Sequence, residues 1–194
     1  LMKVLNLVCS GAGSKYAGPK SQLLLVDLDT GQLAALLMAD AGKYRVLADA
    51  SARLAVTASR QQISTWSSLG EPRGTWECDS IVDAVAVSST SDVVAVLDRA
   101  GMISLCDADG DVHHRWQAHA GAGGALAWNN SGSWLASGGS DGDVVVWDVT
   151  TDDPSSIGEC SMESAEGLVF LGHDRLVVAT DRVDQVMSIF AVET

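Results

Sequence analysis

Basic residues are scarce in this chain of 194 residues. Lys and Arg number 12 against 25 Asp and Glu, so the formal net charge is −13. Proteins that bind duplex nucleic acid gain affinity by neutralising phosphates, and anionic membranes attract basic segments. The charge balance therefore argues against direct nucleic-acid binding and against docking on a membrane surface.

Long hydrophobic runs are also missing. No apolar stretch reaches the roughly 18 residues that a spanning helix needs. The opening LMKVLNLVCSGAG does not fit a lipoprotein signal, because its apolar stretch is short, is interrupted by Asn6, and has the bulky Val8 before Cys9. We expect a cytoplasmic or nuclear protein.

Cysteine and histidine do not form ligand patterns. Cys9, Cys78, Cys106 and Cys160 are far apart and include no CxxC pair, so reduced thiols are expected and a zinc site is not. The adjacent His113 and His114 lie on an expected strand and so point to opposite faces. We expect neither a metal nor another cofactor.

Sequence signatures of catalysis are absent as well. The chain has no GxSxG, HExxH or kinase-type motif, so no catalytic residue is predicted. The stretch DADGD at 107–111 has alternate acids, but its glycine is misplaced for a calcium loop and we interpret it as a hairpin turn. The glycine-rich stretch at 9–16 lacks the spacing of a phosphate loop.

What the chain does contain is a succession of short apolar segments rich in Val, Leu and Ile. Examples are RLAVTASR, DVVAVLDRAG and GDVVVWDVT, with Gly, Asp, Ser and Thr between them. This pattern is typical of short β-strands joined by turns. The segment 31–42, GQLAALLMADAG, has the propensity of a helix, but we predict a strand of about seven residues there.

These segments repeat at a fixed period. Strands that close with a bulky residue and then a small one, polar in all but the last, end at 26–27, 66–67, 106–107, 147–148 and 190–191. The intervals are 40 residues (26 to 66), 40 (66 to 106), 41 (106 to 147) and 43 (147 to 190). Such a period accommodates one antiparallel unit of four short strands. Helical solenoids and immunoglobulin-like sandwiches do not predict it.

With these features the whole chain resembles the WD-repeat β-propeller family. The resemblance is strongest at 117–149, QAHAGAGGALAWNNSGSWLASGGSDGDVVVWDV, which has a connecting His, an SDG turn and a strand closing on Trp-Asp. It implies an all-β propeller of four-stranded antiparallel blades, forming one domain over 1–194. The expected blades are 1–39, 44–78, 81–117, 119–162 and 165–194.

This assignment gives about four and a half blades of a seven-bladed ring. We expect 18 strands where seven blades would need about 28. The missing blades would come from the rest of a longer chain, of which this is the C-terminal part, or from another chain. We expect apolar surface at the two open ends, namely Val4, Leu5 and Leu7 in the first unit and Leu168, Val169 and Phe170 in the last.

The resemblance also implies a buried chain of hydrogen bonds. In the fourth unit its members are His119, Ser137, Asp141 and Trp147, and in the fifth unit Thr180 and Asp184 stand at matching positions. Other units depart from the pattern: Arg60 and Ala100 stand where the Asp belongs, and Cys106 stands for the Trp. The role implied for these residues is structural.

The function implied by the resemblance, with no catalytic motif present, is a non-catalytic platform that holds proteins or peptides in a multiprotein complex. Its candidate binding face combines the connections between units with the turns between second and third strands. The candidate partner-binding residues there are Lys43, Tyr44, Arg60, Asp79 and Arg99. Two alternatives stay open: a propeller hydrolase with a metal in the central channel, and a subunit of an RNA-processing assembly that touches nucleic acid indirectly.

Overall fold

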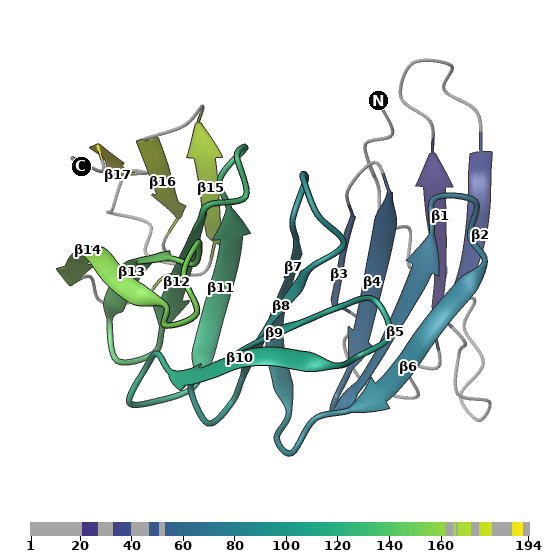
Figure 1. Ribbon diagram of the computed structural model, residues 1–194, viewed down its shortest axis with the longest axis horizontal. Helices are drawn as coiled ribbons and strands as arrows, with labels where there is room; N and C mark the ends of the chain where they lie inside the picture. The colour runs from purple at the N-terminus through teal and green to yellow at the C-terminus, as the bar shows by residue number, and fades with distance from the viewer. Residues whose placement is uncertain are drawn as a thin grey trace, which may run out of the picture.

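The fold of the chain is a series of antiparallel β-sheets arranged along an arc in chain order (Figure 1). The computed structural model describes residues 21–26, 33–39, 47–50, 53–161, 165, 167–171, 175–179 and 188–191. In these ranges the regular structure consists of 17 strands in five sheets, three of which have four strands. The described part contains no helix with the length and hydrophobicity needed to cross a membrane.

Each sheet is built from strands that are consecutive in the sequence. The first sheet pairs β1 (Ser21–Val26) with β2 (Leu33–Ala39). The second contains β3 (Leu47–Ala50), β4 (Leu54–Ser59), β5 (Gln62–Ser67) and β6 (Pro72–Glu77). The third contains β7 (Val82–Val87), β8 (Val94–Asp98), β9 (Met102–Cys106) and β10 (Val112–Gln117).

The remaining two sheets complete the described arc. The fourth contains β11 (Gly123–Trp128), β12 (Trp134–Gly139), β13 (Asp143–Asp148) and β14 (Ser155–Ser161). The fifth contains β15 (Gly167–Leu171), β16 (Arg175–Ala179) and β17 (Ser188–Ala191). The first strands β3, β7, β11 and β15 contact one another in succession, as the inner strands of propeller blades do.

The all-β fold of four-stranded antiparallel blades is thus confirmed, and the segment expected as a strand near residue 35 is β2. Residues 1–20 of the first expected blade lie outside the described residues. The limits of the five expected blades and of the domain as a whole stay predictions.

The hydrophobic core lies in layers between successive sheets. Strand β8 shows why, because its VAVLD sequence is buried along its whole length. Alternate side chains of a strand point to opposite faces, so Val94 and Val96 pack in the layer shared with the second sheet, whereas Leu97 packs against Leu126 and Leu135 of the fourth. Central strands sandwiched in this way require nearly continuous apolar sequence.

The expected exposure of the last sheet is partly wrong. Leu168 and Phe170 pack into the core layer shared with the fourth sheet. Only the alternate residues of β15 are open, with Val169 52% and Leu171 41% exposed. Side chains alternate between the two faces of a strand, so Leu168 and Phe170 lie on one face of β15 and Val169 and Leu171 on the other. Val4, Leu5 and Leu7 lie outside the described residues.

Candidate functional site

Turns and connections from neighbouring sheets are joined at one end of the sheets. They are residues 60–61, 78–82, 99–101, 118–122 and 140–142, and we call this surface the turn face. Backbone hydrogen bonds join its parts: Val82 N–H donates to Arg60 O, Arg99 N–H to Ile81 O, His119 N–H to Gly101 O and Ser140 N–H to Ala122 O. The turns at 60–61 and 99–101 are therefore anchored to the connection that enters the next sheet, and the turns at 99–101 and 140–142 to the connection that enters their own sheet.

The turns themselves depend on left-handed backbone. Gly101 and Gly142 have φ of 78° and 90°, a region that costs other residues more. In the turn between β4 and β5 the left-handed residue is Arg60, with φ of 57°. Arg60 is exposed there, in the position where the sequence pattern would place an aspartate.

The structure brings His119, Ser137, Asp141 and Trp147 together in one chain of hydrogen bonds. The indole Nε1 of Trp147 donates to Ser137 Oγ at 2.9 Å, and Ser137 Oγ lies 2.8 Å from His119 Nε2. His119 Nδ1 lies 3.2 Å from Asp141 Oδ1. With a neutral imidazole the directions are consistent: the serine hydroxyl donates to Nε2 and Nδ1–H donates to the carboxylate.

This chain fastens the connection before β11 to the turn between β12 and β13. His119 is 2% exposed, and Asp141 Oδ2 also accepts the N–H of Ala120 at 2.8 Å. Burial alone would raise the pKa of Asp141, but the N–H groups of Ala120 and Asp143, together with His119, lower it below its ordinary value. The folded state therefore favours the charged carboxylate.

We expect Asp141→Asn to cost about 1 kcal/mol or more at neutral pH, because it weakens hydrogen bonds to buried groups. A carboxylate whose pKa is lowered by folding stabilises the protein above its unfolded pKa, about 3.9, and loses that effect as the pH falls through the folded pKa. The gap between wild type and variant should therefore narrow on acidification. Urea unfolding at about pH 7, 5 and 3 measures it.

The exposed Asp152→Asn is the matched control, expected to change stability little at any of these pH values. If the difference in free energy of unfolding between wild type and Asp141→Asn stays constant or widens on acidification, Asp141 does not stabilise the fold as a charged carboxylate of lowered pKa.

Other units keep only parts of this arrangement. In the second sheet Trp66 Nε1 donates to Thr57 Oγ1 at 3.2 Å, a partner that the sequence reasoning missed. In the third sheet Asp98, rather than any residue at the Ala100 position, caps the turn, because its Oδ1 accepts the N–H groups of Ala100 and Met102 at 2.8 and 3.1 Å. Thr180 and Asp184 lie outside the described residues.

Three of the five candidate partner-binding residues lie on the turn face: Arg60, Asp79 and Arg99. Arg99 Nη2 lies 2.8 Å from Asp83 Oδ1, and Arg115 Nη1 lies 2.8 Å from Asp79 Oδ2. Exposed ion pairs of this kind contribute little to stability, so their main effect is on the charge pattern of the surface. Lys43 and Tyr44 lie outside the described residues.

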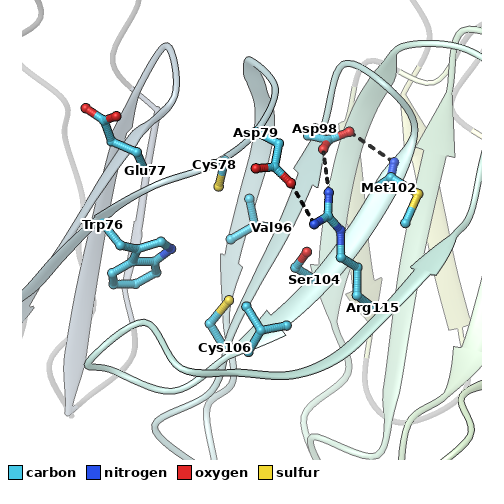
Figure 2. A pocket seen from close by; sticks show the side chains of 11 residues that line it. Trp76, Glu77, Cys78, Asp79, Val96, Asp98, Met102, Ser104, Cys106 and Arg115 are labelled. Atoms are coloured by element: carbon cyan, nitrogen blue, oxygen red, sulfur yellow. Dashed lines mark hydrogen bonds and ion pairs between the residues drawn. The ribbon is translucent and has the colours of Figure 1, made fainter.

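A groove of about 200 Å3 opens between the second and third sheets (Figure 2). We call it the interblade groove. Its lining includes Trp76 and Cys78 at the outer edge of the second sheet, and Val96, Cys106 and Arg115 from the third.

The interblade groove has an apolar end and a charged end. Trp76, Cys78 and Cys106 lie on one side of Val96, whereas Asp79, Asp98 and Arg115 lie together on the other (Figure 2). The sequence reasoning missed this site, because its residues come from two different units.

Two polar atoms of the groove, Trp76 Nε1 and Asp98 Oδ2, have no hydrogen-bond partner within bonding distance. Trp76 Nε1 is buried and has no hydrogen-bond partner. Asp98 is 5% exposed, and its Oδ2 lies 4.0 Å from Arg115 Nη2, beyond hydrogen-bonding distance. Gly110 is needed beneath the indole, because a Cβ there would lie 2.6 Å from the Trp76 ring.

The two thiols of the groove are held in their protonated form. Burial raises the pKa of Cys78 to about 11, with Asp98 adding to the effect. Burial also raises the pKa of Cys106 to about 12. Because the thiolate is the nucleophile and the metal ligand, neither group is suited to covalent catalysis at neutral pH.

We expect Cys78 to react with iodoacetamide about 100-fold more slowly at pH 8 in the folded chain than in urea. The two-unit rise in pKa from 9.0 lowers the thiolate fraction by that factor. Mass spectrometry of the alkylated peptides measures the rate at each cysteine. A rate that levels off near pH 9 in the folded protein would contradict the assignment, since the rate should still be rising there.

The described residues include no group of three or more metal-ligating side chains. The stretch 107–111 is a hairpin turn, as predicted: Asp107 Oδ1 accepts the N–H groups of Asp109, Gly110 and Asp111. His113 lies beside it, with Nε2 3.8 Å from Asp107 Oδ2.

Comparison with known proteins supports the fold. No protein-family model and no curated protein matches the chain. Among solved structures it is similar to a chain in the crystal structure of a mitotic checkpoint complex, with a TM-score of 0.72 and 16% identity over 91% of this chain and 56% of that chain. It is also similar to the computationally designed Ika4 protein, with a TM-score of 0.66 and 18% identity over 81% of this chain and 97% of that chain.

At these identities the likeness concerns the fold alone, and the chain spans only 56% of the checkpoint-complex chain. Together with the four-stranded sheets, it establishes the chain as a partial β-propeller.

Proposed function

We propose that this chain is part of a WD-repeat propeller that acts as a non-catalytic platform for other proteins or peptides in a multiprotein complex. The observation that carries the proposal is the turn face, on which backbone hydrogen bonds fix the turns of three successive sheets. A surface that is already ordered loses little conformational freedom when a partner binds. The likeness to a component of a mitotic checkpoint complex supports a role in an assembly.

The hydrogen-bond chain of the fourth sheet supports the WD-repeat assignment. The four side chains that the family resemblance implies are the four that are linked in this chain, from Trp147 through Ser137 and His119 to Asp141. Their contacts hold a connection to a turn, so their role in the proposal is to keep the turn face rigid.

Charge supports the same proposal. A chain with a net charge of −13 favours partners with a basic surface, and such complementarity speeds association and improves specificity. Arg60 and Arg99 interrupt the acidic surface as exposed anchors, a role in which arginine is enriched at interfaces. The cytoplasmic or nuclear location stays a prediction.

Quantitative affinity purification from the native cells tests the platform. We expect the double variant Arg60→Asp and Arg99→Glu to lose at least one stoichiometric partner by about tenfold or more, the effect of losing one well-packed interface contact. The control is Arg53→Glu with Arg73→Glu, whose side chains lie near Asp92 at the opposite ends of the strands. If both variants retain the same partners as wild type, the turn face is not the binding surface.

A further inference from the structure

The interblade groove has the dimensions and the chemistry of a binding pocket for a single side chain. Its volume is about 200 Å3. It lies beside the turn face, because Asp79 belongs to both surfaces and its carboxylate is paired with Arg115 of the next sheet. An occupant would therefore contact two blades at once.

The charge of the lining favours a cation. The charged end holds two carboxylates, Asp79 and Asp98, and one guanidinium, a formal balance of −1, and Glu77 adds a third carboxylate to the lining beside Trp76 (Figure 2). Arg115 is shared between two of these acids, lying 2.8 Å from Asp79 and 4.0 Å from Asp98. The Oδ1 atom of Asp98 is used by backbone N–H groups, which leaves Oδ2 to accept a further donor. A buried carboxylate gains most from a charged donor.

The rest of the groove favours an aliphatic stem and a peptide backbone. Val96, Cys106 and the Trp76 ring form an apolar surface next to the charged end (Figure 2). The ring nitrogen of Trp76 lies on the side of the indole turned toward Val96 and has no acceptor. Because this nitrogen is buried, a peptide carbonyl bonds to it only when the indole shifts on binding.

We propose that the interblade groove binds a lysine side chain from an extended segment of a partner protein. The ammonium group lies against Asp98 Oδ2 and Asp79, and the methylene groups lie along Val96 toward Trp76. Long cationic side chains commonly combine an apolar contact along the stem with a charged contact at the tip. This inference rests on the proposed platform function and names the chemistry of a partner.

Other side chains fit less well. A neutral aliphatic side chain leaves Asp98 Oδ2 without a donor, and an acidic one is repelled by the lining. Arginine offers a planar fork that suits a carboxylate with both oxygens available, but Arg115 occupies Asp79 Oδ2 and backbone N–H groups occupy Asp98 Oδ1. The compact ammonium of lysine needs only one oxygen from each carboxylate, Asp98 Oδ2 and the oxygen of Asp79 that Arg115 leaves open.

The test uses the 194-residue chain labelled with 15N and titrated with Nα-acetyl-lysine amide, whose side-chain ammonium is free. The indole N–H signal of Trp76, assigned with Trp76→Phe, reports occupancy of the groove. For so small a probe we expect saturation with a Kd of about 1–10 mM. Nα-acetyl-norleucine amide, which lacks the ammonium, should bind at least about tenfold more weakly, as expected for the loss of one charged contact. Nα-acetyl-arginine amide keeps the charge but finds no carboxylate with both oxygens available, and it should also bind at least about tenfold more weakly.

Variants of the lining locate the site. Asp98→Asn removes the negative charge and keeps Oδ1 as an acceptor for the N–H groups of the turn. Asp79→Asn removes a negative charge from an exposed side chain of the same lining. Each should weaken lysine binding about tenfold. Asp83→Asn, which alters only the ion pair with Arg99, is the matched control and should bind as wild type.

Several results would overturn the proposal: equal binding of the lysine and norleucine probes, equal binding of the arginine probe, a Trp76 signal that does not move, or wild-type binding by Asp79→Asn. Failure here is distinguishable from failure of the platform. If the lysine probe does not bind but the turn-face variant still loses partners, the groove assignment alone is wrong.

Discussion

Trp147→Ala is expected to lower the free energy of unfolding by about 3–5 kcal/mol, the range for removing a large aromatic side chain from a core, because Trp147, though only partly buried, packs against the core layer between the third and fourth sheets. Trp147 contributes in two ways. Its ring packs edge-to-face against Trp116 of the third sheet, with centroids 5.5 Å apart, and its N–H donates to Ser137 in the hydrogen-bond chain. Alanine leaves a cavity between two blades and removes a donor from the buried serine.

Two companion variants separate these contributions. Trp147→Phe retains an aromatic ring and loses the N–H, so we expect a smaller cost of about 1–3 kcal/mol. Cys106→Ala, at the equivalent position of the third sheet, removes only a small buried thiol and should be milder than Trp147→Ala. Denaturant unfolding measures all three. A silent Trp147→Ala would show that the fourth blade does not depend on this chain of contacts.

The repeat and the blade architecture could be predicted from the sequence because they are properties of local pattern. Strands of four to seven residues, closed at a period near 40, determine how many antiparallel strands each unit contains. The hydrogen-bond chain of Trp147, Ser137, His119 and Asp141 could also be predicted, because its members lie within a single unit and match the arrangement that the family resemblance implies.

Features that depend on contacts between units could not be predicted in this way. The interblade groove joins Trp76 of one unit to Arg115 of the next, and no single repeat contains it. Asp98 caps its turn from the end of β8, two residues before the position where the family pattern places an acid. A pattern search that fixes positions misses a residue that does similar work from a neighbouring position.

The burial of the last sheet illustrates the same limit on a smaller scale. The sequence Leu168, Val169, Phe170 is uniformly apolar, so composition alone assigns the three residues the same exposure. The pleat of β15 sends Phe170 into the core layer with the fourth sheet and leaves Val169 open. Only the direction of each side chain distinguishes them.

The apolar face of β15 that is turned away from the fourth sheet should make the 194-residue chain self-associate. In solution we expect dimers or larger assemblies rather than monomers. Val169 and Leu171 lie on the same face of β15 and are 52% and 41% exposed. The inner strands β7 and β11 are each covered by the next sheet along the arc. Apolar surface left in water forgoes about 25 cal/mol per Å2, so a covering partner, or a further blade, is favoured.

Light scattering measures the assembly, and a substitution locates it. Val169→Lys with Leu171→Glu should shift the chain strongly toward monomer, because charged groups on this face oppose its burial against a second apolar surface. The control is Leu69→Lys in the turn between β5 and β6, where the side chain is 70% exposed and isolated from the ends of the arc. A wild-type chain that is a cooperatively folding monomer would mean that the face of β15 is stable in water, and that the arc needs no further blade to cover it.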